Sequence, residues 1–506
     1  MKKPKLTFTI LYRKHLALLL CVLLSIGLAA QKGYEIKVKI PNLKNKQILL
    51  GHYFGSQSQC FADDTLILDN RGMGTFKGNN VLPQGLYFIL LPTKVPIDLL
   101  IGEVQHFSME ADTLNLLGTL KYNGSPENEM FADIQRFQGD LSKERTPLME
   151  KYKTATGNKK DSLNKKLEDL NRKSEDFVQR KINELPPNSM LAALLKISQE
   201  IKVPDFPRDG SGKVTDSAFQ YKYYKAHYFD NFDFTDGRLL RTPLYEQKIK
   251  FYLEKMIPPM LDSINMEVDM FLDKTKGNEE LFRYLLSTLY NYYLSSQIVG
   301  FDAVFVHIAE KYYIPYASWS SKEFIENLKK DLAKLKPTLI GQSAPNVKLI
   351  TLPTDHFLAA QNDTALKSNP YLGSNMEIDD IMSKYLVIVF WEADCHHCQQ
   401  AMPVLHDAYE RLKDKGVQVL SVHAISSVPG KRKWIDYINE HRYYDWINAW
   451  SPYSNDYRDL YNLQAFPAIF ILDENKRIIS KRIGAEQVED VINFEMRKAS
   501  FKNQKL

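Results

Sequence analysis

Hydrophobic and polar positions follow different periods along this chain, and the changes of period divide it into three regions. Between residues 34 and 122, short alternating runs such as 34–40, 47–53 and 86–91 are separated by Asn, Gly, Asp and Pro. Alternation of this kind, broken by turn residues, is typical of half-buried strands. We therefore predict a small antiparallel β domain, similar to a β-sandwich, over residues 31–125.

The second region, residues 126–335, has helical spacing and is predicted to be an all-α domain. Its charged stretch at 143–181 is interpreted as a solvated helical hairpin, with partner binding as the alternative. The aromatic segment 221–234 is interpreted as packing between helices. A platform for a peptide or glycan is the alternative there.

The third region, residues 341–506, alternates strands with helices. Its apolar run at 385–391 is typical of a strand buried on both faces. Further strands are predicted at four places: 347–351, 417–422, within 465–472, and 477–483. Helices are predicted between them, up to residue 412, at 431–442 and from 486. This order predicts an α/β fold whose sheet is covered on both faces.

The first thirty residues resemble an export signal. A basic start precedes an apolar run at 16–28, which ends in Ala29-Ala30 and is too short to span a bilayer comfortably. We therefore predict a signal peptide at 1–30, with an uncleaved membrane anchor as the alternative. Cys21 lies inside the apolar run, so lipid attachment is not expected there. The protein is accordingly expected in an extracytoplasmic space, without a stable membrane span after signal removal.

Composition indicates a globular protein without a nucleic-acid partner. The chain has 506 residues, 44% of them hydrophobic and 25% charged. Its formal net charge of +5 comes from five basic residues in the predicted signal, and the remainder is neutral. No strongly basic surface is therefore predicted.

Removal of the signal leaves three cysteines, Cys60, Cys395 and Cys398, which are too few for a structural disulfide framework. Cys60 ends a loop-like stretch at 55–60. We interpret it as an incidental, partly buried thiol, and a resolving or regulatory role is the alternative.

The sequence Cys395-His396-His397-Cys398 directly follows the buried strand and opens a predicted helix. Two cysteines separated by two residues in a first helical turn can form a small disulfide. The unpaired N–H groups and the helix dipole favour a thiolate on the first cysteine. A thiolate is the nucleophile of disulfide exchange.

This sequence lacks the additional residues that other chemistries of a cysteine pair require. A zinc site would need a second cysteine pair or a His-x₃₋₅-His run. Covalent haem attachment needs His directly after the second cysteine, where Gln399 stands. A peroxidatic Thr-x-x-Cys arrangement is ruled out by the segment 391–394. We therefore predict no metal and no cofactor.

Positions around the dithiol carry a family resemblance. They are the pair Phe390-Trp391, Pro403 five residues after Cys398, Phe466-Pro467, and Gly-x-x-Ala-Pro at 341–345. On these residues, the region from 341 to about 500 resembles the thioredoxin fold of TlpA/ResA-like envelope thiol-disulfide oxidoreductases. The regions in front are similar to domains of uncharacterised function that accompany such modules.

The resemblance and the helix dipole together assign roles to the site residues. Cys395 is expected to attack, and Cys398 to resolve the mixed disulfide. Pro467 is expected to pack beside the dithiol after a cis peptide bond, which would expose the backbone of Phe466 to an extended substrate. His396, His397 and Trp391 are predicted to shape the site with them.

Two features set the expected redox properties. Val389 occupies the place where thioredoxins usually carry a buried aspartate, so Glu392 is considered as a proton acceptor. The alternative is that Glu392 is only a solvent-facing acid at the end of a strand. The two histidines should favour the thiolate, whereas Glu392 and Asp394 should oppose it. We expect a reduction potential above the roughly −270 mV of thioredoxin.

These observations predict an exported oxidoreductase that exchanges the Cys395–Cys398 pair with protein thiols or disulfides and with an envelope redox partner. The alternative is a binding scaffold in which the thioredoxin-like region is secondary or structural. The direction of electron flow is left open.

Overall fold

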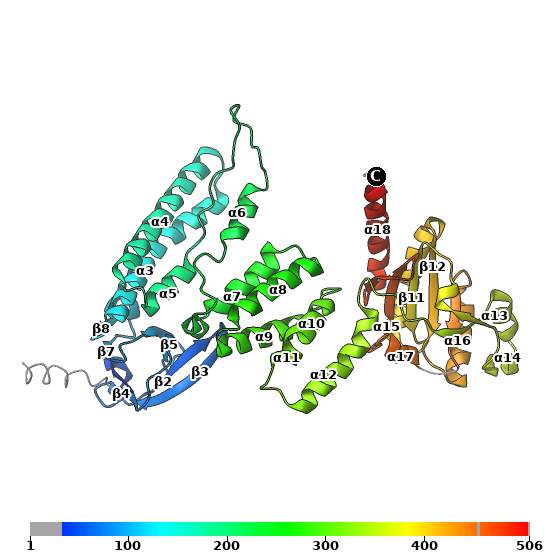
Figure 1. Cartoon of the computed structure of the whole chain (residues 1–506), viewed down its shortest axis with the longest axis horizontal. Coiled ribbons are helices and arrows are strands. Elements are labelled where there is room, and N and C mark those ends of the chain that lie inside the picture. The colour runs from blue at the N-terminus through cyan, green and yellow to red at the C-terminus, as the bar shows by residue number, and fades with distance from the viewer. Residues whose placement is uncertain (1–32, 453–455, 504–506) are drawn as a thin grey trace, which may run out of the picture. The chain divides into compact units, whose positions relative to one another are not determined.

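The computed structural model describes residues 33–452 and 456–503, which divide into two compact units (Figure 1). The first unit runs to Ile257 and includes Lys274–Leu281, and the second comprises Pro258–Asp273 and the chain from Phe282 onward. Helices of the region 126–335 therefore contribute to both units. The predicted signal peptide, 1–30, lies outside the described residues.

The first unit begins with eight strands arranged in two sheets. They are β1 (Tyr34–Lys39), β2 (Gln47–Phe54), β3 (Ser56–Ile67), β4 (Met73–Gly78), β5 (Gly85–Leu90), β6 (Pro96–Ile101), β7 (His106–Glu110) and β8 (Lys121–Asn123). The sheet orders are β4-β1-β7-β8 and β3-β2-β5-β6. Ile36, Leu50 and Tyr87, from both sheets, share one buried core. The predicted β-rich region is thus confirmed.

Two details of this region differ from the predictions. Strand β1 pairs with β7 in parallel, because the chain crosses to the other sheet between them, so the domain is not purely antiparallel. The stretch around Cys60 is part of β3 and not a loop, and the Cys60 thiol is exposed. Because most of β3 faces solvent, its residues 56–60 are largely polar or small and do not show the alternation that indicates a strand.

The middle region is helical, as predicted. Its helices are α3 (Pro126–Thr154), α4 (Gly157–Glu184), α5 (Met190–Ser198), α6 (Phe219–His227), α7 (Leu244–Phe251), α8 (Leu261–Thr275), α9 (Glu279–Leu294), α10 (Asp302–Ile308), α11 (Ile314–Tyr316) and α12 (Lys322–Leu335). The short helix α2 (Leu116–Thr119) precedes this region, between β7 and β8. The charged stretch forms the α3–α4 hairpin, in which Phe137 stacks on Phe177 at 3.9 Å between ring centroids. Within the described ranges, no helix combines the length and apolar character that a membrane span needs.

The rest of the second unit is built on a seven-stranded sheet, in the order β10-β9-β13-β12-β11-β14-β15. The strands are β9 (Lys348–Thr351), β10 (Ser374–Glu377), β11 (Tyr385–Trp391), β12 (Val417–His423), β13 (Ile447–Trp450), β14 (Ala468–Asp473) and β15 (Ile478–Lys481). The helices are α13 (Thr354–Ala360), α14 (Thr364–Ser368), α15 (His396–Leu412), α16 (Val428–His441), α17 (Asp456–Leu460) and α18 (Val488–Asn503). Strands β11, β12 and β13 are parallel, and β14 is antiparallel to β11.

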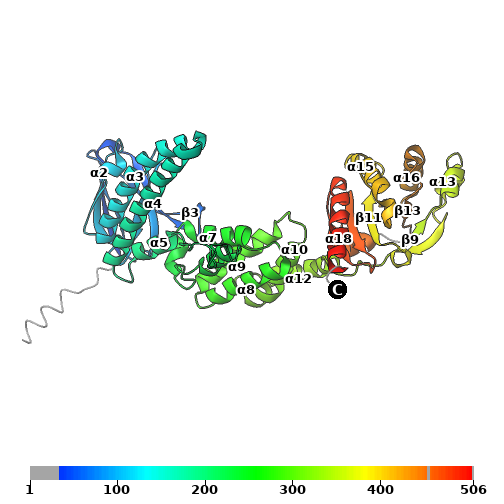
Figure 2. The same ribbon diagram turned by 90° about the horizontal axis from the view of Figure 1, so that it is seen from above.

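Alternate residues of β11 face two separate cores. Val387 and Trp391 pack in the core that α15, α16 and α18 cover (Figure 2), whereas Ile388 and Phe390 pack with Tyr457 on the other face. Burial on both faces explains why the whole run 385–391 is apolar. The predicted α/β fold of this region is confirmed.

An ion pair joins the sheet to the helical segment before it in the same unit. Lys481, in β15, has a side chain only 3% exposed and pairs with Asp302 of α10. Burial lowers the pKa of Lys481, and Asp302 opposes that shift. A buried ammonium group without a counter-ion would be strongly destabilising, so α10 supports the folded sheet.

Candidate active site

The dithiol lies at the junction of β11 and α15. Cys395 is the N-cap residue of α15, with extended backbone angles of −80° and 118°, and its side chain is partly exposed. Cys398 lies one turn further along the helix and is fully buried. Both are free thiols. Only the first sulfur is therefore accessible to a partner, and it stands where the N–H groups of the helix start are unpaired.

Burial separates the two thiols chemically as well. It raises the pKa of Cys398 to about 12, and the nearby Cys395 and Glu392 add to the rise, against a lowering backbone hydrogen bond. Cys398 is therefore protonated at neutral pH.

The loop before β14 lies next to the first sulfur. The thiol of Cys395 donates a long hydrogen bond of 3.7 Å to the carbonyl oxygen of Phe466. The peptide bond between Phe466 and Pro467 is cis. The structure thus places the loop and the dithiol together across 71 residues of sequence.

Both acids that flank the dithiol are paired with cations. Glu392 forms a 3.0 Å ion pair with Arg458 of α17, and Asp394 pairs with Lys433 of α16 at 2.5 Å. Arg458 also donates to the carbonyl of Ala424 at 3.1 Å. The sequence interpretation treated these acids as uncompensated, because their partners lie 66 and 39 residues away and no local pattern indicates them.

Arg458 connects this ion pair to the proline loop. Its guanidinium carbon lies 4.8 Å from the centroid of the Phe466 ring, a cation–π arrangement. The same side chain thus contacts the flanking acid Glu392 and the loop residue whose carbonyl faces Cys395. Arg458 is a site residue that the sequence reasoning missed.

The two histidines of the motif are exposed on the first turn of α15. Their ring centroids lie 6.0 Å apart. They adjoin Cys395 in sequence and are open to solvent, so any effect of His396 and His397 on the thiolate is screened by water. Their influence on the redox potential stays a prediction.

Trp391 is fully buried, and its Nε1 donates a 2.7 Å hydrogen bond to Oγ of Ser421. It therefore packs beneath the site and offers no surface to a substrate. Val389, in the place of the expected aspartate, is buried in the same core. Neither side chain can exchange a proton with the dithiol.

His423 at the end of β12 is a buried polar residue that sequence reasoning did not identify. Its side chain is 1% exposed, and its Nε2 accepts a 3.3 Å hydrogen bond from the backbone N–H of Ala393. Burial lowers the pKa of His423 from 6.5 to about 4, so the imidazole is neutral at physiological pH. A neutral histidine thus holds the segment that leads into Cys395.

Two sequence families match parts of the chain. A "Thioredoxin-like" family matches residues 383–478, and a "Domain of unknown function (DUF5106)" matches residues 155–332. The first match contains the dithiol and the Phe466-Pro467 loop. The second lies within the helical region.

Relatives were found among curated proteins and solved structures. The thiol-disulfide oxidoreductase ResA of Bacillus cereus is 23% identical over 126 residues, 24% of this chain and 68% of that protein. For ResA of Oceanobacillus iheyensis the identity is 24% over 127 residues, 24% of this chain and 62% of that protein.

A crystal structure of a thioredoxin-like protein from Bacteroides caccae aligns with 58% of this chain and 99% of its own, at 18% identity and a TM-score of 0.42. A domain of a possible thiol-disulfide isomerase from Cytophaga hutchinsonii aligns with 32% of this chain and 97% of its own, at 27% identity and a TM-score of 0.27. The C-terminal region of this chain is a thioredoxin-like domain, homologous to thiol-disulfide oxidoreductases of the ResA type.

Proposed function

We propose that the protein is an exported thiol-disulfide oxidoreductase that exchanges the Cys395–Cys398 pair with protein thiols or disulfides in the cell envelope. The observation that carries this proposal is the asymmetry of the two thiols. Cys395 is partly exposed at the start of a helix, whereas Cys398 is buried behind it with a raised pKa. Export rests on the signal-like sequence at 1–30.

In the reducing direction, the Cys395 thiolate attacks one sulfur of a substrate disulfide. A bond forms between Cys395 and that sulfur, and the other substrate sulfur leaves as a thiolate that takes up a proton. Cys398 then loses its proton and attacks Cys395, which releases the second substrate thiol. Two electrons pass to the substrate, and the protein is left with a Cys395–Cys398 disulfide. Oxidation of a substrate is the same sequence reversed.

The surroundings supply the other roles. The carbonyl of Phe466, beside Cys395, lies where an extended substrate backbone would pass, and Pro467, His396 and His397 would border that path. Glu392 is the proposed acceptor for the Cys398 proton. Its negative charge contributes to the raised pKa of Cys398, which supports this assignment.

Capture of a mixed disulfide tests the proposal. With Cys398→Ser, the mixed disulfide on Cys395 cannot be resolved, so we expect disulfide-linked complexes with envelope proteins. Dithiothreitol should separate these complexes by reduction. The measurement is non-reducing electrophoresis of an envelope extract. The Cys395→Ser, Cys398→Ser double variant is the control and should capture nothing. Equal capture by both variants would contradict the proposed nucleophile.

The reduction potential should lie above the roughly −270 mV of thioredoxin, because two imidazoles directly follow the nucleophile and both nearby acids are paired with cations. Replacing His396 and His397 together with alanine should lower the potential by about 30 mV, since the thiolate loses two neighbouring imidazole groups that can donate hydrogen bonds to it. Equilibration with glutathione buffers measures both values.

Arg458→Met is expected to shift the potential in the same direction, because it leaves Glu392 unpaired beside the dithiol. Arg411→Met is the matched control. Arg411 lies on α15, further from the dithiol, and pairs with Glu489 of α18, so its loss should leave the potential unchanged. For the unaltered protein, a reduction potential below that of thioredoxin would contradict the expectation of a higher value.

A further inference from the structure

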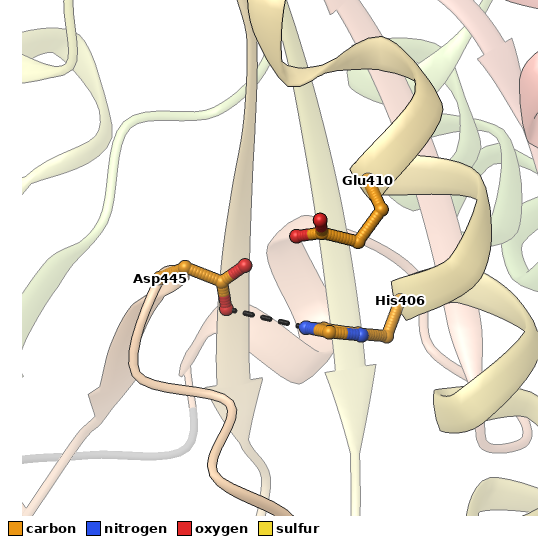
Figure 3. A group of neighbouring side chains, drawn as sticks. All are labelled: His406, Glu410 and Asp445. Atoms are coloured by element: carbon orange, nitrogen blue, oxygen red, sulfur yellow. Dashed lines mark hydrogen bonds and ion pairs between the residues drawn. The ribbon is translucent and has the colours of Figure 1, made fainter.

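A second cluster of polar side chains (Figure 3) lies near the C-terminal end of α15, whereas the dithiol lies at the start of this helix. His406 and Glu410 stand one turn apart on α15, and Asp445 lies in the loop between α16 and β13. Their potential donor atoms all lie within 4.8 Å of one another. The spacing of four residues brings the two helical side chains to the same face of α15.

The distances suit a small cation. Nε2 of His406 lies 3.3 Å from Oδ1 of Asp445. Two ligands of a tetrahedral ion with bonds of 2.0–2.1 Å are separated by about 3.3 Å. The Glu410 carboxylate points toward the same space as the other two groups (Figure 3). A small movement of Glu410 therefore completes a three-ligand set.

Packing holds two of the three groups in place. The His406 ring stacks on Tyr443 at 4.7 Å between centroids and lies 5.5 Å from the Trp446 ring. The Tyr409 hydroxyl donates a 3.2 Å hydrogen bond to the backbone carbonyl of Asp445. Helix and loop are thus joined by contacts that do not depend on an ion, so little order has to be gained on binding.

The charges also favour a cation. Two carboxylates, Glu410 and Asp445, converge here, and Lys413 pairs with Oε2 of Glu410 at 2.6 Å. One ammonium group therefore faces two carboxylates. The side chains are 25% (His406), 42% (Glu410) and 34% (Asp445) exposed, so an ion can enter and retain water.

We propose that His406, Glu410 and Asp445 bind one divalent transition-metal ion, with water in the remaining positions. One imidazole and two carboxylates suit zinc and its neighbours better than calcium or magnesium, which prefer oxygen ligands only. The ion would clamp the end of α15 to the loop before β13. It would take no part in disulfide exchange, so a negative result for this site would not affect the proposed function, and the reverse also holds.

Calorimetry with zinc chloride tests the site on the untagged full-length protein. The Cys395→Ser, Cys398→Ser background removes the dithiol as a competing ligand. We expect one ion per chain, and weakening of at least about tenfold in each of Glu410→Gln and Asp445→Asn. Cobalt in the same background should give a spectrum without a sulfur-to-metal charge-transfer band.

Glu489→Gln is the matched control, because it removes a carboxylate of α18 that pairs with Arg411 of α15, outside the proposed site. Its affinity should equal that of the background. The two amide variants preserve the packing of His406, so they separate ligand loss from misfolding. Absence of saturable binding, or affinity unchanged in both amide variants, would overturn the proposal.

Discussion

Replacing Cys395 with serine is expected to lower the rate of insulin disulfide reduction by about two orders of magnitude or more, to near the uncatalysed rate. A serine hydroxyl does not ionise at neutral pH and cannot form a mixed disulfide. Cys398 cannot take over the attack, because it is fully buried and burial raises its pKa to about 12. The measurement is the turbidity of reduced insulin with dithiothreitol as electron donor.

Cys60→Ser is the matched control for this experiment. Cys60 is the other free thiol among the described residues, it is exposed, and it lies in β3 of the first unit. Its loss should leave the rate unchanged. Full activity of Cys395→Ser would refute the assigned nucleophile. No turnover by the unaltered protein would favour the alternative of a binding scaffold whose thioredoxin-like region is structural.

Acidification should destabilise the thioredoxin-like region through His423. The unfolded imidazole has an ordinary pKa of 6.5, whereas burial lowers it to about 4 in the folded state. Between these two pKa values the unfolded state binds more protons than the folded state. The contribution of His423 to the unfolding free energy is therefore fully present above pH 6.5 and is lost as the pH falls toward 4. The shift corresponds to about 3 kcal/mol of unfolding free energy.

The same protonation should loosen the segment that leads into Cys395, because a protonated Nε2 can no longer accept the hydrogen bond from Ala393. His423→Gln retains an acceptor without titrating, so its stability should depend less on pH. His356→Gln, on the exposed side of α13, is the control. A pH dependence of His423→Gln equal to that of the unaltered protein would contradict this expectation.

Urea titrations followed by tryptophan fluorescence measure the effect. Of the five tryptophans in the chain, four lie in the thioredoxin-like region, at 391, 434, 446 and 450. Fluorescence therefore reports mainly on the part of the protein that contains His423. Comparing variants across pH removes contributions common to all of them, such as protonation of surface carboxylates.

Local patterns were sufficient to predict the framework of the site. The run 385–391 indicated a strand buried on both faces, and the residues that follow indicated a helix with Cys395 at its start. The cis bond before Pro467 was anticipated from the family resemblance. These features depend on neighbours in sequence or on a known motif, so one sequence reveals them.

Features that depend on distant contacts could not be predicted. Arg458 and Lys433 neutralise the acids beside the dithiol from two different helices, and His423 contacts Ala393 across 30 residues. Nothing near Arg458 in the sequence distinguishes it from a surface arginine. Strand β13 (Ile447–Trp450) was missed because its four residues include Asn448, whose buried amide donates to the backbone carbonyls of Tyr443 and Trp446 and interrupts the apolar run.

The candidate metal site shows the same limit. The spacing of His406 and Glu410 is visible in the sequence, and a search for helical pairs of ligand type would find it. Asp445 joins them only because α16 returns the chain to α15 before β13 begins. Common zinc patterns begin with a cysteine pair or a His-x₃₋₅-His run, and the His406–Glu410 pair fits neither.

The pairing of Lys481 with Asp302 determines where this protein can be divided. A chimaera joined at residue 341 would transplant the complete sheet but leave behind the counter-ion of its last strand. A junction placed before α10 would carry both partners of the pair. In a chimaera, the thioredoxin-like region of this chain should therefore be transferred together with α10 and the helices after it, as one unit.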